Sequence, residues 1–292
     1  MISAIVPTFR GQERLERNLA SVIESLAATG DAWEIVVVDD GGGALGALPA
    51  GARVLSRVEN RGYGPAVNAG VADSRGEWLL ILNDDVRLER ACVSVLRRAL
   101  VEPSLFAATP GIRSPLAACG DEGGHRGVFR AGLLELDERP PAGQAPTLYA
   151  VGCCYLCPRA LFEDLGGYDD VFAPFFWEDV DLGYRAWRRG LRILHVPEAV
   201  CHHEGSATLR QRPLAERAQA ELRSRALFHL RNLQEPALRA RSLGALLAIA
   251  LLDPSPARQA GLAEALARFG ASGARGRGGL SDSEILARAA GA

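Results

Sequence analysis

A short apolar run that ends in two adjacent acids constrains the fold of this chain more than any other feature. Residues 78–82 read Trp-Leu-Leu-Ile-Leu and lead directly into Asn83, Asp84 and Asp85. Such a run is typical of a buried strand that opens at its end into a cleft. Asn and Asp are also favoured in turns, so these residues alone leave a plain turn and a ligand site equally open.

Strand and helix patterns alternate along the first hundred residues. The predicted strands lie at residues 3–6, 33–38, 53–55 and 78–82. Apolar residues at helical spacing over 13–28, and a proline near the start of 65–73, predict the helices between them. This order predicts an α/β fold, a mostly parallel sheet of Rossmann-like type flanked by helices on both faces.

Polar residues follow three of these predicted strands. Pro7-Thr8, Asp39-Asp40 and Asn83–Asp85 each stand at a strand's carboxyl end. Ligands of parallel sheets bind beyond those ends, so the fold gathers these residues at one edge. Carboxylate oxygens there can hold a hard divalent cation, which can neutralise the diphosphate of a sugar nucleotide.

Two glycine-bearing segments lie near this edge. Asp39-Asp40 precedes Gly41-Gly42, where a carboxylate can accept a hydrogen bond from a nucleobase or ribose and glycine lets a ligand approach. A simple turn explains these residues equally well. Residues 60–64 lead into a helix start, a natural seat for an anion, but they lack the third glycine of the dinucleotide fingerprint.

Aromatic and acidic residues cluster in the second half of the chain. Phe175-Phe176-Trp177 precedes Glu178, Asp179 and Asp181, and the acids open an amphipathic helix. Helix capping explains part of the acidic cluster but not the aromatic residues. An aromatic wall beside carboxylates suits a sugar, and an acid there could act as a general base.

The histidines at 202 and 203 follow a strand-like segment at 191–196. For one such histidine alone, a structural role is favoured. Beside a strand-end carboxylate pair, a neutral imidazole becomes a candidate metal ligand. Residues 111–147, rich in Gly, Pro and charge, are expected to form a long loop or irregular excursion.

The composition indicates a globular protein without bulk electrostatic affinity for nucleic acid. The 292 residues are 48% hydrophobic and 23% charged, with a net charge of −2. The N-terminus lacks a secretory pattern, and the apolar segment 243–252 is too short to span a bilayer. Six cysteines are expected to be reduced and packed as small hydrophobes, which fits a cytoplasmic location, and Cys154-x-x-Cys157 lacks a second pair for a zinc finger.

Taken in order, these motifs resemble the family 2 glycosyltransferases, and in particular their rhamnosyltransferase-like branch. The resemblance covers about residues 2–232. It rests on Val6-Pro7-Thr8, Val38–Gly41, Asn60-Arg61-Gly62 with Asn68-x-Gly70, Leu82–Asp85, Gly152, Gly166–Asp169, Trp177–Leu182 and His202–Ser206. Each segment is loose, but eight of them in the same order are specific.

The resemblance implies a GT-A fold and sugar transfer from a nucleotide-sugar donor with inversion at the anomeric carbon. The donor-binding residues that it implies are Pro7, Thr8, Phe9, Asp39, Asp40, Asn60, Arg61, Gly62, Asn68, Asn83, Asp84 and Asp85. Gly152, Trp177 and Glu178 are the implied acceptor-binding residues, and Asp179 matches the catalytic general base.

The same resemblance implies a divalent cofactor, Mn²⁺ or Mg²⁺. Asn83 stands where the family's Asp-x-Asp element has its first acid, which leaves a weaker set of ligands. Asp85 is therefore the expected metal ligand, with His202 as a further ligand and His203 as the alternative. Asp84 is expected to hold the ribose or to orient the donor sugar.

We expect a glycosyltransferase domain over residues 1–213, with a nucleotide-binding half at about 1–110 and an acceptor half at about 148–213. Residues 214–292 are expected to form a helical appendage that caps the domain, joins two copies as a homodimer or touches the membrane surface. The donor is dTDP-rhamnose or a UDP- or GDP-sugar, and the acceptor a glycan, a lipid-linked glycan or a small molecule. Such a lipid-linked acceptor would be met at the inner membrane face. The alternatives are a sugar nucleotidyltransferase and an inactive sugar-nucleotide-binding protein.

Overall fold

The central sheet places the ends of its parallel strands at one edge of the molecule. The computed structural model describes residues 1–292 except 44, 116, 139–142, 206–211, 277 and 292. Nine strands form one sheet in the order β3-β2-β1-β4-β10-β6-β11-β5, and β9 pairs with β11. Strands β1 to β4 are parallel, as are β6 and β11, while β10 runs antiparallel between β4 and β6.

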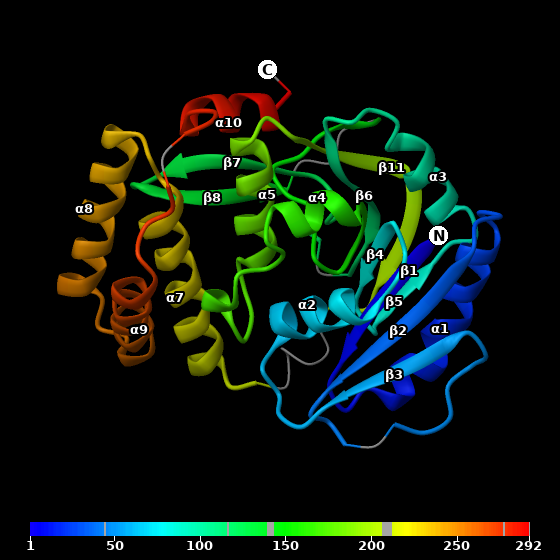
Figure 1. Cartoon of the computed structure of the whole chain (residues 1–292). Coiled ribbons are helices and arrows are strands. Elements are labelled where there is room, and N and C mark those ends of the chain that lie inside the picture. The colour runs from blue at the N-terminus through cyan, green and yellow to red at the C-terminus, as the bar shows by residue number, and fades with distance from the viewer. Residues whose placement is uncertain (44, 116, 139–142, 206–211, 277, 292) are drawn as a thin grey trace.

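The strands and helices of the N-terminal half follow the predicted order as far as residue 82, and the three elements beyond it were not predicted (Figure 1). They are β1 (Ile2–Thr8), α1 (Gln12–Ala27), β2 (Trp33–Asp40), β3 (Ala52–Arg57), α2 (Tyr63–Asp73), β4 (Trp78–Leu82), β5 (Val86–Leu88), α3 (Cys92–Ala99) and β6 (Leu105–Arg113). The runs in β1, β2 and β4 are apolar without alternation because both faces of the sheet are covered. Ile35 and Val37 pack against the layer of α1 and α3, whereas Val36 and Val38 pack on the opposite face.

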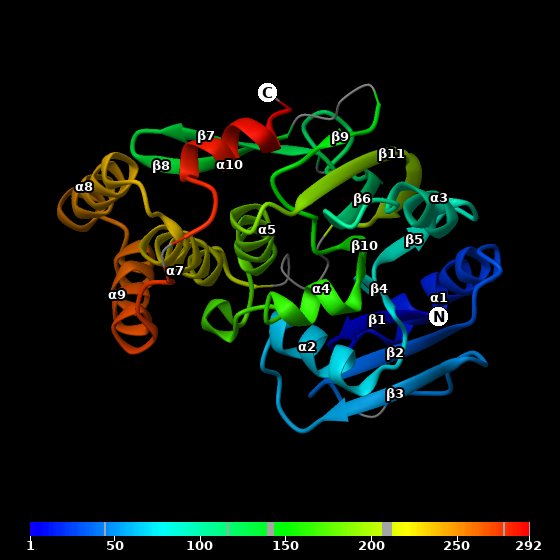
Figure 2. The same ribbon diagram turned by 45° about the horizontal axis from the view of Figure 1, so that its top comes forward.

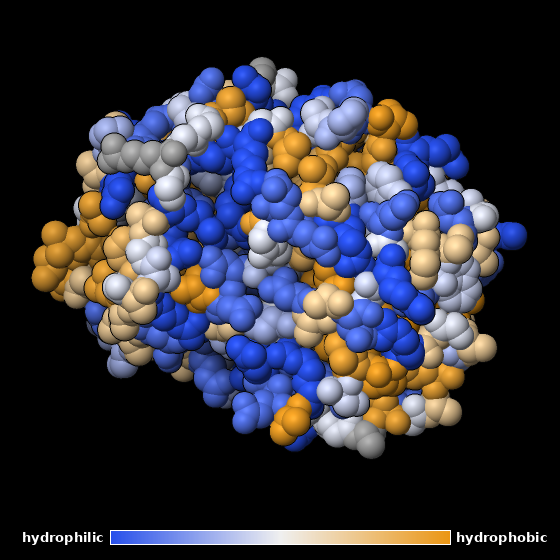
Figure 3. Space-filling model, viewed as in Figure 1, coloured by the Kyte–Doolittle hydropathy of each residue, from blue (hydrophilic) through white to orange (hydrophobic). Residues whose placement is uncertain are grey.

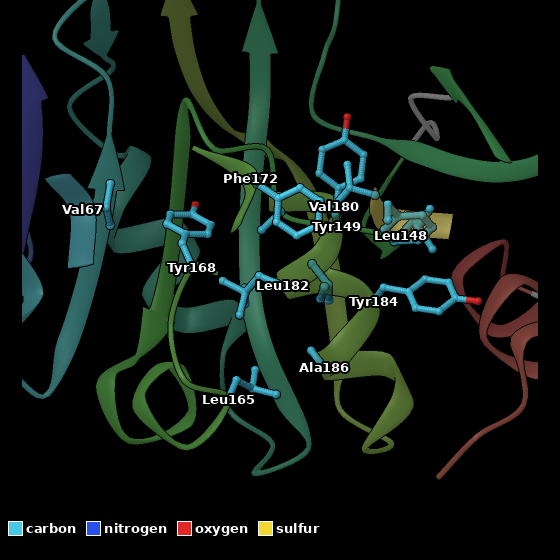
Figure 4. Close-up of a cluster of buried hydrophobic side chains, with 14 of the residues drawn as sticks. Val67, Leu148, Tyr149, Leu165, Tyr168, Phe172, Val180, Leu182, Tyr184 and Ala186 are labelled. Atoms are coloured by element: carbon cyan, nitrogen blue, oxygen red, sulfur yellow. The ribbon is translucent and has the colours of Figure 1, made fainter. Parts of the chain in front are cut away.

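The second half adds a hairpin and a group of helices. Its elements are β7 (His125–Arg130), β8 (Leu133–Glu138), β9 (Ala145–Pro146), β10 (Cys154–Pro158), α4 (Arg159–Asp164), the 3₁₀ turn η1 (Asp170–Phe172), α5 (Glu178–Arg188), β11 (Arg192–His203), α7 (Leu214–Asn232), α8 (Pro236–Leu252), α9 (Pro256–Ser272) and α10 (Asp282–Ala289). Helix α5 packs its apolar face into the larger core through Val180, Leu182 and Ala186 (Figure 4).

The expectation of a long loop over residues 111–147 was wrong for most of that segment. Strand β6 continues to Arg113, and β7 and β8 form an antiparallel hairpin. Ala131 and Gly132 both have positive φ angles, 48° and 83°, as a tight two-residue hairpin turn requires. The charged residues that suggested a loop alternate along the two strands of this hairpin.

The C-terminal helices share a hydrophobic core with the sheet. Leu222 and Phe228 of α7, Leu262 of α9 and Ile285 of α10 belong to the same buried cluster as Ile5 and Leu79. Helices α8 and α9 lie beyond α7, at the end of the molecule away from β1–β3, and α10 lies beside the hairpin (Figures 1 and 2). Whether residues 214–292 form a separate domain stays a prediction.

Helix α8 exposes an apolar surface at this end of the molecule (Figure 3). Leu247, Leu251 and Leu252 are 59%, 74% and 80% exposed. Among the described residues, no helix is long and apolar enough to cross a membrane.

Candidate active site

A cavity of about 460 Å³ opens at the carboxyl ends of β1, β2 and β4. Most of the residues predicted for the site line it, namely Pro7, Thr8, Phe9, Asp40, Asn60, Gly62, Asn83, Asp84, Asp85, Gly152, Trp177, Glu178 and Asp179. The sheet therefore gathers residues as far apart in sequence as Pro7 and Asp179 at one edge, as the strand pattern predicts.

Asp84 and Asp85 have different surroundings. Both oxygens of Asp84 accept hydrogen bonds from Arg14, at 2.8 and 2.9 Å, and Thr8 donates a further one. Asp84 is thereby fixed to β1 and α1, and this pairing orients the loop after β4. The Oδ1 atom of Asp85 lies 3.4 Å from Nε2 of His203.

The two histidines at the end of β11 point in opposite directions because side chains alternate along a strand. His203 is buried between Asp85 and Glu122, with its Nδ1 3.1 Å from Glu122 Oε2. His202 instead lies 3.1 Å from the exposed Glu89. This geometry does not support the choice of His202 as the metal ligand, and it favours the alternative, His203.

The pKa of His203 reflects this pair of carboxylates. Burial alone would lower the pKa of the imidazole. Hydrogen bonds to Asp85 and Glu122, together with their negative charges, outweigh burial and raise the pKa to about 9. The imidazolium therefore occupies a place where the two acids favour positive charge.

The loop after β3 is fixed by Asp40 rather than by its own residues. Asp40 accepts hydrogen bonds from the backbone N–H groups of Arg61 and Gly62 and pairs with Arg57 at 2.8 Å. Gly62 has a φ of 98°, and a Cβ there would lie 2.3 Å from the carbonyl oxygen of Pro174. Only glycine allows these two segments of the cavity wall to meet.

Asp179 stands at the start of α5 and reaches across to the loop before β10. Its Oδ2 accepts a hydrogen bond from the Gly152 N–H at 3.0 Å, and its Oδ1 accepts one from Val180 N–H at 2.8 Å. Asn83 N–H donates to the carbonyl of Cys153 at 2.9 Å. Two hydrogen bonds, both to the segment Gly152-Cys153, therefore connect the loop of Asp85 to Asp179.

The chain enters α5 through strained backbone. Phe176 and Trp177 have φ angles of 79° and 69°, in the left-handed region that non-glycine residues seldom adopt. Such strain is often kept at functional sites. Here it turns Trp177, Glu178 and Asp179 toward the cavity that they line.

Glu178 and Asp179 both have raised pKa values. Burial raises the pKa of the Glu178 carboxyl, and the neighbouring Asp179 raises it further. Burial also raises the pKa of Asp179, against hydrogen bonds from Gly152 and Val180 that lower it. Oε2 of Glu178 has no hydrogen-bond partner among the described residues. A carboxylate with a raised pKa in a cleft is suited to accept a proton.

Four of the residues predicted for the site do not line the cavity. The side-chain amide of Asn68 donates a hydrogen bond to the Tyr168 carbonyl at 2.8 Å and accepts one from the Tyr168 N–H at 3.0 Å. These two hydrogen bonds join α2 to the loop before η1. Asp39 accepts a hydrogen bond from Gly42 N–H, and Arg61 points to Asp170 on the surface. His202 contacts the carboxylate of Glu89. Ser206, the last residue of the motif that begins at His202, is outside the described residues.

Several residues that line the cavity lie in or next to the segment 111–147, for which the sequence pattern predicts a loop. Glu122, His125, Leu136 and Glu138 come from the hairpin and its approach, and Tyr149 lies just beyond. The signal was present as two short alternating runs around Ala131-Gly132. Tyr63, Phe175, Phe176 and Arg212 complete the aromatic and basic parts of the wall.

Comparison with known proteins identifies relatives of the sequence. A model of the family "Glycosyl transferase family 2" matches residues 3–166. N-acetylglucosaminyl-diphospho-decaprenol L-rhamnosyltransferase of Mycobacterium tuberculosis is 28% identical over 243 residues, 71% of this chain and 78% of the relative. Pre-mycofactocin glycosyltransferase of the same organism is 25% identical over 201 residues, 66% of this chain and 42% of the relative.

Solved structures share the fold. GalNAc-T7 with UDP, GalNAc and Mn²⁺ superposes with a TM-score of 0.58 at 16% identity, over 88% of this chain and 58% of that one. TarS residues 1–349 of S. aureus in complex with UDP-GlcNAc superposes with a TM-score of 0.57 at 17% identity, over 92% of this chain and 80% of that one. The mannosyltransferase PcManGT of Pyrobaculum calidifontis, with GDP-Man and Mn²⁺, superposes with a TM-score of 0.54 at 20% identity, over 94% of this chain and 76% of that one.

The predicted fold class is confirmed by these likenesses, and the predicted family by the family model. A C-terminal group of helices follows the sheet, as expected. This chain belongs to glycosyltransferase family 2, is similar to its rhamnosyltransferases, and is a glycosyltransferase.

Proposed function

We propose that the protein transfers a sugar, rhamnose or another hexose, from a nucleoside-diphosphate donor to a hydroxyl group of an acceptor, with inversion and with a divalent cation. The observation that carries this proposal is the placement of Asp179. It lines the same cavity as Asp85 and His203 but comes from α5, where the Gly152 N–H holds it, rather than from the end of β4 or β11. Base and leaving group must lie on opposite sides of the sugar in an inverting displacement.

Asp179 is the proposed general base. It would take the proton of the acceptor hydroxyl as that oxygen attacks the anomeric carbon. Gly152 and Val180 hold the carboxylate in place through backbone N–H groups, while burial keeps its pKa raised. A positioned base of this kind typically contributes on the order of 10²–10⁴ in rate.

Asp85 and His203 are the proposed ligands of the catalytic cation. A carboxylate oxygen and an imidazole nitrogen 3.4 Å apart fit a divalent cation such as Mn²⁺ or Mg²⁺. A cation bound there would supply positive charge beside the departing diphosphate. Asp84 is already paired with Arg14, so we assign it to orienting this loop rather than to the cation.

The remaining walls suit a donor and an acceptor. Pro7, Thr8, Asn60 and Gly62 offer backbone and polar groups to the nucleotide, and Asp40 holds their loop. Gly152, Trp177 and Glu178 face the acceptor side. We propose dTDP-rhamnose first, with UDP- and GDP-sugars as the other donors to compare, and a glycan or lipid-linked glycan met at the cytoplasmic membrane surface as acceptor.

The test is a donor panel without an added acceptor. Purified protein is mixed with dTDP-rhamnose, UDP-sugars and GDP-sugars in Mn²⁺, and both the melting temperature and slow release of nucleoside diphosphate are measured. We expect one nucleotide class to raise the melting temperature and to be hydrolysed, with EDTA abolishing hydrolysis and Mn²⁺ restoring it. Hydrolysis unaffected by EDTA would contradict the metal assignment, and no stabilisation by any donor would contradict the function.

The stereochemical part of the proposal has its own readout. The anomeric configuration of the sugar first released from the donor, followed by proton NMR, should be the opposite of the donor's. Retention would contradict a single displacement and therefore the role given to Asp179.

A further inference from the structure

Two side chains from separate loops, Glu122 and Cys153, meet His203 in a way that the transfer reaction does not require. Glu122 precedes β7, Cys153 precedes β10 and His203 ends β11. One donor atom from each lies within 4.8 Å of the others. Cys153 and His203 are each 6% exposed, the side chain of Glu122 is 18% exposed, and all three line the cavity.

His203 presents its two ring nitrogens to different partners. Nε2 faces Asp85 at 3.4 Å, whereas Nδ1 faces Glu122 at 3.1 Å. A metal ion can therefore approach the imidazole from either side. When one nitrogen binds a metal, the other usually donates its hydrogen to a carboxylate that fixes the ring. When Nδ1 is the ligand, Asp85 is the carboxylate that can accept the hydrogen of Nε2.

The chemistry of the donor set differs from one side of the ring to the other. On the Asp85 side, the ligands are oxygen and nitrogen, which suit Mn²⁺ and Mg²⁺ when joined by a diphosphate. With Glu122, Cys153 adds a sulfur, and one ligand atom from each lies within 4.8 Å of a ring nitrogen of His203. A Cys, His and carboxylate set with a fourth position open is one that Zn²⁺ favours.

The distances between the ligand atoms of Glu122, Cys153 and His203 need only a small change to fit a zinc ion. Bonds of about 2.0–2.3 Å in a tetrahedron place ligand atoms about 3.3–3.8 Å apart. Glu122 and His203 are already at 3.1 Å, and no pair in the set exceeds 4.8 Å. The cavity gives an ion a path from solvent to all three residues.

We propose that Glu122, Cys153 and Nδ1 of His203 form a second metal site, selective for Zn²⁺, that is distinct from the catalytic cation site but shares His203 with it. Zinc on Nδ1 leaves Nε2 protonated and hydrogen-bonded to Asp85. The imidazole then has no lone pair for the catalytic cation, and zinc acts as an inhibitor that competes with Mn²⁺.

Cobalt tests the site without any sugar transfer. Co²⁺ replaces Zn²⁺ in such sites, and a thiolate ligand gives it a charge-transfer absorption in the near ultraviolet. We expect that absorption on titrating the full chain with Co²⁺, its loss on adding Zn²⁺, and its absence in Cys153→Ser. Cys119→Ser, which changes an exposed cysteine elsewhere, is the matched control and should keep the absorption.

Zinc affinity provides the second readout. Cys153→Ser and Glu122→Gln should each weaken Zn²⁺ binding by at least 10-fold, with Mn²⁺ binding changing less, and each variant's melting temperature shows that it is folded. Absence of the thiolate absorption in the wild-type chain, or its persistence in Cys153→Ser, would overturn the proposal. Because neither readout needs a donor or an acceptor, such a failure would leave the proposed transferase function untouched.

Where transfer or donor hydrolysis is measurable, zinc should inhibit it. We expect Zn²⁺ to raise the Mn²⁺ concentration needed for half-maximal rate in the wild-type chain. In Cys153→Ser, compared with its own zinc-free rate, the same Zn²⁺ should inhibit at least 10-fold less. Equal inhibition of both proteins would contradict a site that includes Cys153.

Discussion

Asp179 and Asp181 stand two residues apart on α5, and their surroundings shift their pKa values in opposite directions. Within the described part of the chain, Asp179 accepts its hydrogen bonds from backbone N–H groups, beside a second buried acid, and its pKa is raised mainly by burial. Asp181 is fully buried, and burial alone would raise its pKa too. Arg185 and Arg275, at 2.8 and 2.9 Å, together with an amide hydrogen bond from Asn232, lower the pKa instead.

The two faces of α5 explain this difference. Asp179 faces the cavity of the sheet edge. Behind Asp181 lies a smaller cavity of about 360 Å³ whose lining includes Arg185, Arg188, Arg189, Arg231 and Arg275. These arginines join α5 to α7 and to the segment before α10. One face of the helix therefore keeps a carboxylate that is paired with no cation among the residues that the structure describes, which suits proton transfer. The other face uses a carboxylate to attach the C-terminal helices.

The largest expected effect is the loss of turnover in Asp179→Asn. Without a base, transfer or donor hydrolysis should fall on the order of 10²–10⁴, while donor affinity changes little. Initial rates and donor titrations on the same preparation measure both quantities. Turnover close to the wild-type value would break the comparison, because Asp179 would then be no more catalytic than Asp181.

Asp181→Asn should act on stability rather than on the chemistry. Removing one partner of a buried ion pair typically costs about 3–5 kcal/mol. Here it takes the Asp181 carboxylate away from the guanidinium of Arg185 and leaves Arg275 paired with Asp169. Denaturant unfolding measures this loss. Asp164→Asn, which removes an exposed partner of Arg189, is the control and should cost at most about 1 kcal/mol. Equal losses in the two variants would show that the arginine network is not what holds α5.

The adjacent histidines repeat the contrast within β11. His203→Ala should weaken Mn²⁺ binding by about 10–100-fold, since it removes a ligand and the residue that Asp85 faces. His202→Ala removes only a contact with exposed Glu89 and should leave Mn²⁺ binding unchanged. Calorimetric titration with Mn²⁺ and a nucleoside diphosphate gives both values, and a reversed order would restore His202 as the ligand.

Glu178→Gln should have the smallest effect and should sharpen the account of Asp179. Burial and the negative charge of Asp179 raise the pKa of Glu178 to about 8, so Glu178 is still protonated where Asp179 ionises. Its replacement by Gln should therefore leave the acid side of the pH–rate profile in place. In the unfolded chain Glu178 ionises in the ordinary range of a carboxyl, whereas burial keeps it protonated in the folded chain up to about pH 8, which costs stability at neutral pH. The variant should therefore also unfold at slightly higher denaturant concentration at neutral pH. A shift of the acid side of the profile in this variant would contradict the order in which the two carboxyls ionise.

Much of the sheet edge could be predicted because local sequence patterns determine it. Apolar runs ending in Pro7-Thr8, Asp39-Asp40 and Asn83–Asp85 are read from one segment at a time, and parallel topology brings them together. The hairpin of β7 and β8 was missed because charged residues fill its solvent-facing positions and its turn lacks the usual Asn-Gly pair.

Pairings between distant segments could not be read from the sequence. Nothing near Asp84 indicates Arg14, seventy residues away, and nothing near Asp181 indicates Arg275. The choice between His202 and His203 depends on which face of β11 meets Asp85, and a shift of one residue reverses it. Tertiary packing, rather than composition, decides each of these.

The pH dependence of the reaction tests the role of Asp179 most directly. The base works only when it is deprotonated, and its raised pKa means that activity should rise with pH through a value above that of an ordinary aspartate. We predict this rise in kcat/KM for the wild-type enzyme at saturating Mn²⁺, and its absence from the residual activity of Asp179→Asn. The same rise, at the same pH, in Asp179→Asn would contradict the assignment of Asp179 as the general base.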